Sequence, residues 1–527
     1  MSDPQPIAGR LFGIETEYGI LVEGRGAQDL MEESRLLVRA YPGVWAGPWD
    51  YRAEGPRQDM RGFQAERLNY NEEDARLDRG APWRGMSAEE QRSDRALANG
   101  ARLYNDHGHP EYSTPECRTL QELVAHDRAG ERIVLECGRR RTEETRREVR
   151  LFKNNTDFHG ISYGCHEGYL TERCVPFERL LHGMLPFLVT RILYAGAGKV
   201  GVESGGPLAR ECPFQLSQRA DFFTEVASVD TLARRPIFNT RDEPHADARR
   251  YRRLHVICGD ANMSEFATAL KVGTTCLALG LIEAGWEPLF RLKNPVDAIQ
   301  RVSRDPSFRW LVELEDGRTI RATDIQRVYL RDAQKLLAGA GPETDWTLRE
   351  WERVLDDLEA DPFRAEDRLD WVAKRKLLEA YIEAENLWWE DEALRSLDLE
   401  YHNIDPELGL HAALEQGGQM ARVVDDTQIE QAVSRPPRNT RAALRGELVR
   451  RFAEAIERVS WGRAALKAET GPRWVEFPAG FGAREQEAHL ITCLETVKTA
   501  SEAAGLIEDF NSPNPSSQET PYAADQG

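Results

Sequence analysis

Apolar and polar residues alternate in short runs in several parts of the chain, a pattern that predicts β-strands. Residues 11–20 (LFGIETEYGI) form an apolar run bounded by glycine, which predicts a core strand. Residues 99–116 (NGARLYNDHGHPEYSTPE) begin at an Asn-Gly turn signal and continue as a second strand. Pro110 is expected to end that strand, because proline cannot donate to a ladder of hydrogen bonds. A further strand is predicted over residues 214–221.

Other stretches carry apolar residues at helical spacing. Residues 266–282 are mostly apolar but contain Lys271 and two glycines, which favours a buried helix over a membrane span. Ser264 is suited to cap its start. Residues 121–147 are heavily charged and predict a largely helical region at the surface.

The segment 41–98 interrupts this regular pattern, because it is polar, rich in Gly, Pro and Arg, and poor in periodicity. Its run 49–63 (WDYRAEGPRQDMRGF) is either a functional loop or part of a plain disordered insert. A domain boundary is expected near residue 410. The prediction is a large domain over 1–410 with an inserted loop at about 41–98, a small C-terminal domain over 411–510, and a disordered tail over 511–527.

Composition narrows the classes of function. The 527 residues carry a net charge of −20, which argues against non-specific binding to nucleic acid or to an anionic membrane. The eight cysteines are scattered without a C-x-x-C pair, which predicts free thiols in a reducing cytoplasm and no zinc site. The N-terminal MSDPQPIAGR has no apolar core, so no signal peptide is indicated. We expect a cytoplasmic monomer.

Glu15 and Glu17 are the first candidate site. Spaced by two on a strand, they point to the same side. Paired carboxylates repel unless a cation lies between them, and hard oxygen ligands suit Mg²⁺. The alternative is an edge strand whose glutamates face solvent.

The strand in residues 99–116 carries the second candidate site. Period-2 geometry places Arg102, Tyr104 and Asp106 on one face, with Glu111 following after Pro110. So many polar groups cannot be buried without partners. A solvated sheet face is the alternative.

Three more polar concentrations follow along the chain. Residues 154–167 include Asp157, residues 214–221 include Arg219, and residues 239–247 include Arg241. Beyond them, Arg253 and His255 share a predicted strand face. Each could be a solvated or internally satisfied group. Taken together, carboxylates with a histidine would hold Mg²⁺, and arginines would hold the phosphates of a nucleotide on a sheet. Asp106 could act as a base or nucleophile if it lies beside the metal cluster and not inside it, because ligation would lower its pKa.

The motifs GIETEYGI, NGARLYNDHGHPEYSTPE, KNNTDFHGISYG, FQLSQRADF, NTRDEPHADARRYRRLHVICGDAN and SRPPRNTRAALRGE resemble the Pup ligase/Pup deamidase family, from about residue 10 to about 500. Pup is a small, disordered ubiquitin-like modifier. The resemblance implies an α+β fold with a glutamine synthetase-like curved antiparallel sheet flanked by helices, and a small C-terminal domain. It also implies ATP or ADP bound with Mg²⁺ in the cradle of the sheet. Pup or a Pup-like modifier and pupylated proteins would be the partners.

Residue by residue, the resemblance implies a catalytic role for Asp106. The metal ligands implied are Glu15, Tyr104 and Glu111, with Glu17 and Asp157 as further candidates. The nucleotide contacts implied are Arg102 and Thr114, with Arg219, Arg241, His255 and Trp461 as further candidates.

The family has two branches. Ligases join the C-terminal glutamate of Pup to a lysine, and deamidases convert a C-terminal glutamine to glutamate and remove Pup from lysines. The long segment between Glu15 and Asp106 and the run 49–63 resemble the deamidase branch. The motif SYGCHEGYL also resembles the deamidase form SYGTHENYL, with Cys165 and Gly168 replacing Thr and Asn.

We therefore predict an ATP/Mg²⁺-dependent deamidase and depupylase. Asp106 would attack the terminal amide or activate a water, arginines would stabilise the oxyanion, and the nucleotide would act mainly as a cofactor. In the alternative, a Pup–protein ligase, Asp106 would deprotonate the lysine and ATP would form a glutamyl phosphate. A non-enzymatic binding module and a ligase for a small amine are further alternatives.

Overall fold

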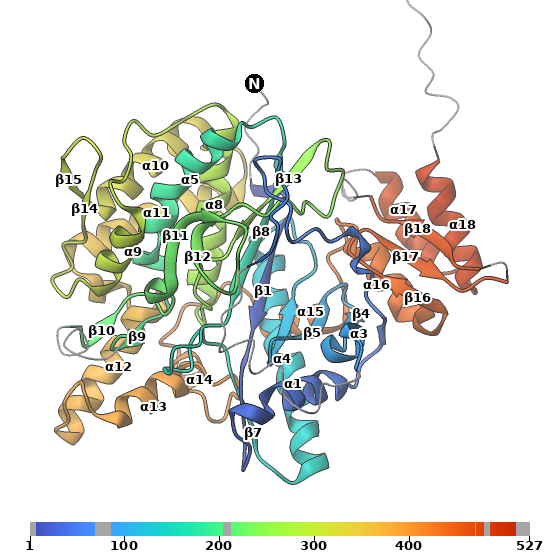
Figure 1. Cartoon of the computed structure of the whole chain (residues 1–527), viewed down its shortest axis with the longest axis horizontal. Coiled ribbons are helices and arrows are strands. Elements are labelled where there is room, and N and C mark those ends of the chain that lie inside the picture. The colour runs from blue at the N-terminus through green and yellow to red at the C-terminus, as the bar shows by residue number, and fades with distance from the viewer. Residues whose placement is uncertain (1–6, 69–85, 204–211, 470, 479–484, 513–527) are drawn as a thin grey trace, which may run out of the picture.

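The computed structural model describes residues 7–68, 86–203, 212–469, 471–478 and 485–512. At its centre lies a seven-stranded sheet in which all neighbouring strands are antiparallel (Figure 1). Its strands, in spatial order, are β13 (Tyr251–Val256), β8 (Cys165–Glu172), β1 (Phe12–Glu17), β6 (His109–Ser113), β5 (Arg102–Asp106), β4 (Arg95–Leu97) and β3 (Trp45–Ala46). The predicted fold class, α+β with an antiparallel sheet flanked by helices, is confirmed.

The central sheet has one face in the core and one face that carries polar side chains. Along β1, buried residues alternate with half-buried ones, so Ile14 and Thr16 face the core while Glu15 and Glu17 face the other side. The core face packs against α4 (Leu120–Thr145) and α8 (Glu265–Glu283). We call the opposite face the site face. Strand alternation delivers every second residue of the central strands to it.

Helix α8 is the buried helix predicted from the sequence. Every one of its residues is buried, and the Ser264 hydroxyl accepts a hydrogen bond from the Ala267 N–H at 3.1 Å, which confirms the predicted cap. Such a cap contributes about 1 kcal/mol. By length and composition α8 could cross a membrane, but here it lies entirely inside the protein.

Helix α4 corrects one prediction. The helical assignment is right, and the Thr119 hydroxyl caps it by accepting from the Glu122 N–H at 3.1 Å. Its placement at the surface was wrong, because one side packs on β1 and β6 and on α8. The charged residues that suggested exposure lie on its other side or pair internally. For example, Asp127 and Glu131 hold the buried Lys153 at 2.6 and 2.9 Å.

Two strand predictions also need correction. Pro110 lies inside β6, where its carbonyl oxygen accepts from the Tyr18 N–H at 2.9 Å. The chain reverses instead at His107 and Gly108, whose φ angles of 47° and 93° suit a two-residue hairpin turn. Of the strand predicted over 214–221, only β10 (Phe214–Gln215) forms, and Arg219 lies in the irregular segment after it.

The remaining helices cover the sheet or extend from it. They are α1 (Leu30–Arg39), α3 (Ala88–Arg92), α5 (Phe177–Thr190), α6 (Ile192–Ala195), α9 (Pro295–Arg304), α10 (Ala322–Leu337), α11 (Pro342–Ala360), α12 (Asp370–Glu385), α13 (Glu392–Tyr401), α14 (Leu410–Gln416), α15 (Asp426–Ser434), α16 (Ala442–Phe452), α17 (Glu485–Leu494) and α18 (Ala500–Asn511). The other strands are β2 (Gly19–Val22), β7 (Val149–Phe152), β9 (Lys199–Val200), β11 (Phe223–Ser228), β12 (Arg235–Asn239), β14 (Leu311–Glu313), β15 (Thr319–Arg321), β16 (Ile456–Val459), β17 (Arg463–Leu466) and β18 (Arg473–Glu476).

A second apolar core lies at one side of the molecule, drawn in orange and red in Figure 1. The strands β16, β17 and β18 form its sheet, and α16, α17 and α18 contribute to it. Residues of the segment 41–98, among them Trp49 and Ala96, pack into the same core. This segment is therefore not wholly irregular, since it supplies β3 and β4 to the central sheet. Its residues 69–85 and the tail residues 513–527 lie outside the described residues, and the division near residue 410 stays a prediction.

Candidate active site

Glu15 and Glu17 lie in the middle of the site face. Strand β1 pairs with β6 on one side and β8 on the other, so the alternative of a solvated edge strand is wrong. In register, Glu15 is opposite Ser113 and His166, and Glu17 is opposite Glu111. The prediction that both glutamates point to the same side is confirmed, but the sheet gives them different neighbours.

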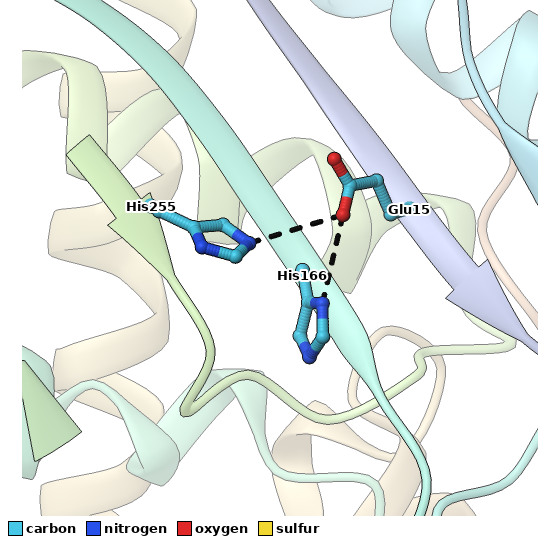
Figure 2. A group of neighbouring side chains, drawn as sticks. All are labelled: Glu15, His166 and His255. Carbon is cyan, nitrogen blue, oxygen red and sulfur yellow. Dashed lines mark ion pairs between the residues drawn. The ribbon is translucent and has the colours of Figure 1, made fainter. Parts of the chain in front are cut away.

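Basic groups from β8 and β13 surround Glu15 (Figure 2). Its Oε2 lies 3.6 Å from His166 Nδ1 and 3.8 Å from His255 Nε2. Its Oε1 lies 3.1 Å from Arg253 Nη1. Burial alone would raise the pKa of Glu15, but the two nearby imidazoles and the charge of Arg253 outweigh it and hold this pKa well below its usual range. Burial, helped by Arg253, lowers the pKa of His255 to about 3, so its ring is neutral.

Two acidic groups from β5 and β6 lie beside Glu17, and His109 Nδ1 of β6 lies 3.7 Å from its Oε2. Carboxylate oxygens of Glu17, Asp106 and Glu111 all lie within 4.8 Å of one another, and we call these three residues the acidic cluster. Burial and the charge of Asp106 raise the pKa of Glu17, and burial with the same repulsion raises the pKa of Glu111 well above its usual range. A divalent cation would relieve this repulsion.

The acidic cluster fits the chemistry of Mg²⁺. It offers only oxygen donors, which that ion prefers, and Tyr104 lies opposite Glu111 in register. The group around Glu15 offers one carboxylate and two imidazoles, and imidazole also suits transition metals. The predicted ligands Glu15, Glu17, Tyr104 and Glu111 are thus all brought to the site face.

Asp106 is the last residue of β5 and a member of the acidic cluster. Arg92 Nη2 and His107 Nδ1 approach the same oxygen, Oδ1, at 3.7 and 3.2 Å. Although burial opposes ionisation, the charges of His107, Arg92 and Arg102 lower the pKa of Asp106 strongly. The expectation that Asp106 lies beside a separate metal cluster does not match this geometry. A carboxylate so firmly ionised suits attack on a carbonyl or orientation of a water better than removal of a proton.

Arg102 is buried and is held by the segment 41–98. Its Nη2 lies 2.6 Å from Asp94 Oδ1 and donates to the Tyr51 hydroxyl at 3.0 Å. Its guanidinium lies 4.3 Å from the centre of the Trp49 ring. A nucleotide phosphate would have to share or replace these partners, and the nucleotide role of Arg102 stays a prediction.

A pocket opens beside Glu15 where the sheet meets the second core. It is lined by Gly13, Glu15, Thr114, Arg253 and Trp461, together with Gly168, His245, Arg441 and neighbouring residues. Gly13 and Gly168 are opposite each other in register, so no side chain rises from its floor at these positions. The pocket shares His245, Arg441 and Trp461 with a larger cleft of about 900 Å³. Thr114 and Trp461, both predicted nucleotide contacts, thus meet in one pocket from sequence positions far apart.

Salt bridges attach the wall of this pocket to the sheet. Arg445 Nη2 lies 2.7 Å from Glu116 Oε2, and Arg441 Nε lies 2.6 Å from Glu116 Oε1. Arg445 also donates to the Trp461 carbonyl oxygen at 2.9 Å. The Trp461 ring meets Trp49 edge-on with centroids 5.1 Å apart. Although burial opposes it, the two arginines lower the pKa of Glu116 to about 2.

Three predicted residues do not line this pocket. Arg241 is half-buried near Glu243, at 3.7 Å, and does not line the pocket. Asp157 lies outside both carboxylate groups, because its Oδ1 accepts from the N–H groups of His159 and Ile161 at 2.8 and 3.0 Å. This geometry does not support a ligand role for Asp157. Arg219 lies past Glu17, away from the pocket.

Sequence reasoning missed several residues of the site. His166 was seen only as part of a polar concentration, although its register opposite Glu15 makes it a direct neighbour. Arg92 and His107 were not singled out at all. His107 directly follows Asp106, and that proximity was an available signal. The contact of Arg92 depends on how the segment 41–98 folds, which no local pattern indicates.

The fold and the site together define a class of enzyme in which carboxylates lie on the open face of an antiparallel sheet, beside a pocket. The family described as Pup-ligase protein matches residues 10–465, and the chain belongs to this family.

Relatives from both branches are similar to the chain. A depupylase of Acidothermus cellulolyticus is 41% identical over 515 residues, covering 94% of this chain and 99% of the relative. A Pup deamidase/depupylase of Mycolicibacterium smegmatis is 41% identical, covering 95% and 99%. A Pup–protein ligase of Acidimicrobium ferrooxidans is 42% identical, covering 85% and 90%.

Two solved structures share the fold. The Pup ligase PafA in complex with Pup matches with a TM-score of 0.74 at 32% identity, covering 96% of this chain and 95% of that one. PafA in complex with ADP matches with a TM-score of 0.70 at 36% identity, covering 83% and 98%.

Proposed function

We infer that this chain is a Pup deamidase/depupylase: it hydrolyses the side-chain amide of a C-terminal glutamine of a Pup-like modifier and the isopeptide bond between that modifier and a lysine. The observation that carries this is the acidic cluster, in which the ionised Asp106 is approached by Arg92 from the segment 41–98. The relatives named depupylase and Pup deamidase align over almost their whole length, that segment included.

ATP or ADP with Mg²⁺ would complete the site. The pocket at Thr114 and Trp461 would hold the nucleotide, and the acidic cluster with Glu15 and Tyr104 would hold the ion. When bound, the ion would supply the positive charge that offsets both the carboxylates of the cluster and the phosphates of the nucleotide. The fit rests on the oxygen-only donor set and on the raised pKa values of Glu17 and Glu111, which follow from burial and from repulsion between the carboxylates.

The residues of the chain then have separable tasks. Arg92 and His107 lie beside Oδ1 of Asp106. Asp106 attacks the amide carbon or orients the water that does. The carbon–nitrogen bond breaks, ammonia or the lysine amine leaves with a proton, and water supplies the oxygen of the new carboxylate. No phosphate bond is consumed in this balance.

The test mixes the purified protein, ATP, Mg²⁺ and a modifier that ends in Gln, and follows conversion of Gln to Glu by mass. Asp106→Asn should abolish conversion, whereas Asp316→Asn, in the exposed β14–β15 turn, should leave it unchanged. Cleavage of the isopeptide bond in a modifier–protein conjugate should likewise be lost in Asp106→Asn and unchanged in Asp316→Asn.

A Pup–protein ligase is the second candidate, favoured by the ligase structures that share the fold. Formation of a conjugate from a modifier ending in Glu, with release of ADP and no conversion of Gln, would establish the ligase and rule out the deamidase.

We also propose that the protein acts as a monomer in the cytoplasm. All eight cysteines are free thiols, which supports a reducing compartment. Size-exclusion chromatography with light scattering measures the oligomeric state.

A further inference from the structure

Arg219 is a buried cation without an anionic partner. Its side chain is 1% exposed, and among the described residues no carboxylate oxygen lies within 4.0 Å of it. It donates through Nη1 to the Ile257 carbonyl oxygen and through Nε to Ser162 Oγ at 3.3 Å, while Nη2 makes no hydrogen bond to a described group. Burying an unpaired charge is unfavourable unless something compensates it.

Other buried arginines of the protein show the usual solution. Arg191 lies 2.6 Å from Glu167 on the core face of β8, and Arg445 lies 2.7 Å from Glu116. Both belong, with Arg219, to the largest fully buried side chains. Arg219 differs because no described carboxylate forms a salt bridge with it; the acidic charges that act on it, those of Glu17 and Asp260, do so from beyond salt-bridge distance.

The segment around Arg219 is held in place by other contacts. The Ser217 hydroxyl accepts from the Arg219 N–H at 3.1 Å and donates to Asp260 Oδ1 at 2.9 Å. Asp260 Oδ2 accepts from the N–H groups of Ala197 and Gln218 at 2.8 and 2.9 Å. The Asp260 carboxylate therefore accepts from two backbone N–H groups and the Ser217 hydroxyl, and it forms no salt bridge with Arg219.

Arg219 does not line the pocket proposed for the nucleotide. That pocket lies at the Gly13–Glu15 end of β1, with Thr114 and Trp461. Arg219 donates a hydrogen bond to Ser162. Two residues further along the chain, the carbonyl oxygen of Gly164 accepts from the Glu17 N–H at 3.1 Å, so Arg219 is close to the Glu17 end of β1. Along β1 the order is nucleotide pocket, Glu15, acidic cluster and Arg219. The cation lies on the far side of the reacting groups from the nucleotide.

We propose that Arg219 binds the α-carboxylate of the C-terminal residue of the modifier; this rests on the proposed function. A guanidinium pairs a carboxylate through two parallel N–H groups, and Nη2 is available for it. A terminal glutamine carries its amide and its α-carboxylate at opposite ends of a short chain. An anion site just past the acidic cluster matches that separation.

This assignment accounts for substrate range. The α-carboxylate is present in the Gln-ended modifier, in the Glu-ended product and in the lysine conjugate, because the isopeptide bond uses the side chain. A glutamine inside a polypeptide lacks it. One residue would thus accept both substrates and reject internal glutamines.

The test compares a modifier ending in Gln with the same modifier carrying an α-carboxamide. For the wild-type enzyme, kcat/KM should fall about 100-fold or more on the carboxamide, mainly through KM, because a buried charge is left unpaired. Arg219→Gln should lower kcat/KM on the free acid to a similar level, so that the ratio between the two substrates approaches one. Arg219→Lys should restore part of the preference.

Controls separate recognition from folding and from nucleotide binding. Arg252→Gln should keep the wild-type ratio, because this arginine of β13 bonds, among the described residues, the Val175 carbonyl oxygen alone. Affinity for ADP and the thermal unfolding temperature should be retained in Arg219→Gln. Equal activity of the wild-type enzyme on both substrates would overturn the proposal. So would an Arg219→Gln variant that keeps the ratio, or one that loses ADP affinity.

A binding measurement distinguishes failure of this proposal from failure of the proposed function. Affinity of wild type and Arg219→Gln for the Glu-ended modifier and its α-carboxamide needs no turnover. The wild-type enzyme could convert no Gln and still bind the free acid more tightly than the carboxamide, with the difference lost in Arg219→Gln. That result would overturn the deamidase function but support binding of the α-carboxylate by Arg219. Equal affinities of the wild-type enzyme for the Glu-ended modifier and for its α-carboxamide would overturn the role proposed for Arg219.

Discussion

Glu15 and Glu17 are two residues apart on one strand and share one face, yet their surroundings are opposite. Strands β8 and β13 bring His166, His255 and Arg253 to Glu15, whereas β5 and β6 bring Asp106 and Glu111 to Glu17. The pKa of Glu15 is lowered and that of Glu17 is raised. The pKa of a carboxylate on a central strand is therefore set by the side chains that the two neighbouring strands bring to it.

Neutralising each glutamate should separate their roles most clearly. Glu15→Gln and Glu17→Gln should each lower kcat by at least about 100-fold if both hold the charged ligands. Without metal and nucleotide, their stabilities should change in opposite directions. Glu17→Gln relieves the repulsion between carboxylates and should raise the free energy of unfolding by about 1 kcal/mol. Glu15→Gln leaves Arg253 without its carboxylate partner and should lower the free energy of unfolding by a similar amount. Chemical denaturation in EDTA measures both, and changes of the same sign would contradict the comparison.

Filling the pocket floor tests the basic side alone. A Cβ at Gly168 would meet Arg253 Cδ at 3.4 Å, a contact that small adjustments tolerate. Gly168→Val should therefore fold and should weaken ADP binding about 30-fold or more, since its methyl groups occupy the floor. Gly505→Ala, where the nearest atom is 3.9 Å away, is the control. Unchanged ADP affinity in Gly168→Val would show that the nucleotide lies elsewhere.

A pH series tests the salt bridges behind the pocket. The pKa of Glu116 is lowered in the folded protein to about 2 from 4.5, so its contribution to stability is present above pH 4.5 and is lost as pH falls towards 2. Wild type should lose about 1–2 kcal/mol from this residue between pH 5 and pH 3. Glu116→Gln should lack that part of the loss, which urea unfolding at each pH measures. A parallel loss in the variant would assign the effect to other carboxylates.

Removing Arg92 tests the acidic side most gently. The contact to Asp106 is 3.7 Å long and the side chain is 37% exposed, so Arg92→Ala should lower kcat only about fivefold, equivalent to about 1 kcal/mol. Arg92→Lys should recover part of the loss, and Arg57→Ala, an exposed arginine of the same segment, should have no effect. A loss above about 100-fold would give Arg92 a direct role in the reaction.

Strand periodicity correctly predicted which residues share a face. It placed Glu15 with Glu17, and Arg102 with Tyr104 and Asp106, because side chains alternate along any strand. It could not predict which strands become neighbours, and so missed His166 beside Glu15. It also could not predict that Asp94 and Tyr51 would hold Arg102, since those contacts require the segment 41–98 to fold over the sheet.

The pocket wall at Trp461 has a consequence for the order in which the protein becomes active during synthesis. All strands of the central sheet are complete once residue 256 has emerged, while Arg441, Arg445 and Trp461 follow much later. A nascent chain can therefore carry the complete set of carboxylates before it can close the pocket beside them. The pocket beside the carboxylates can close only after translation has reached residue 461 of 527.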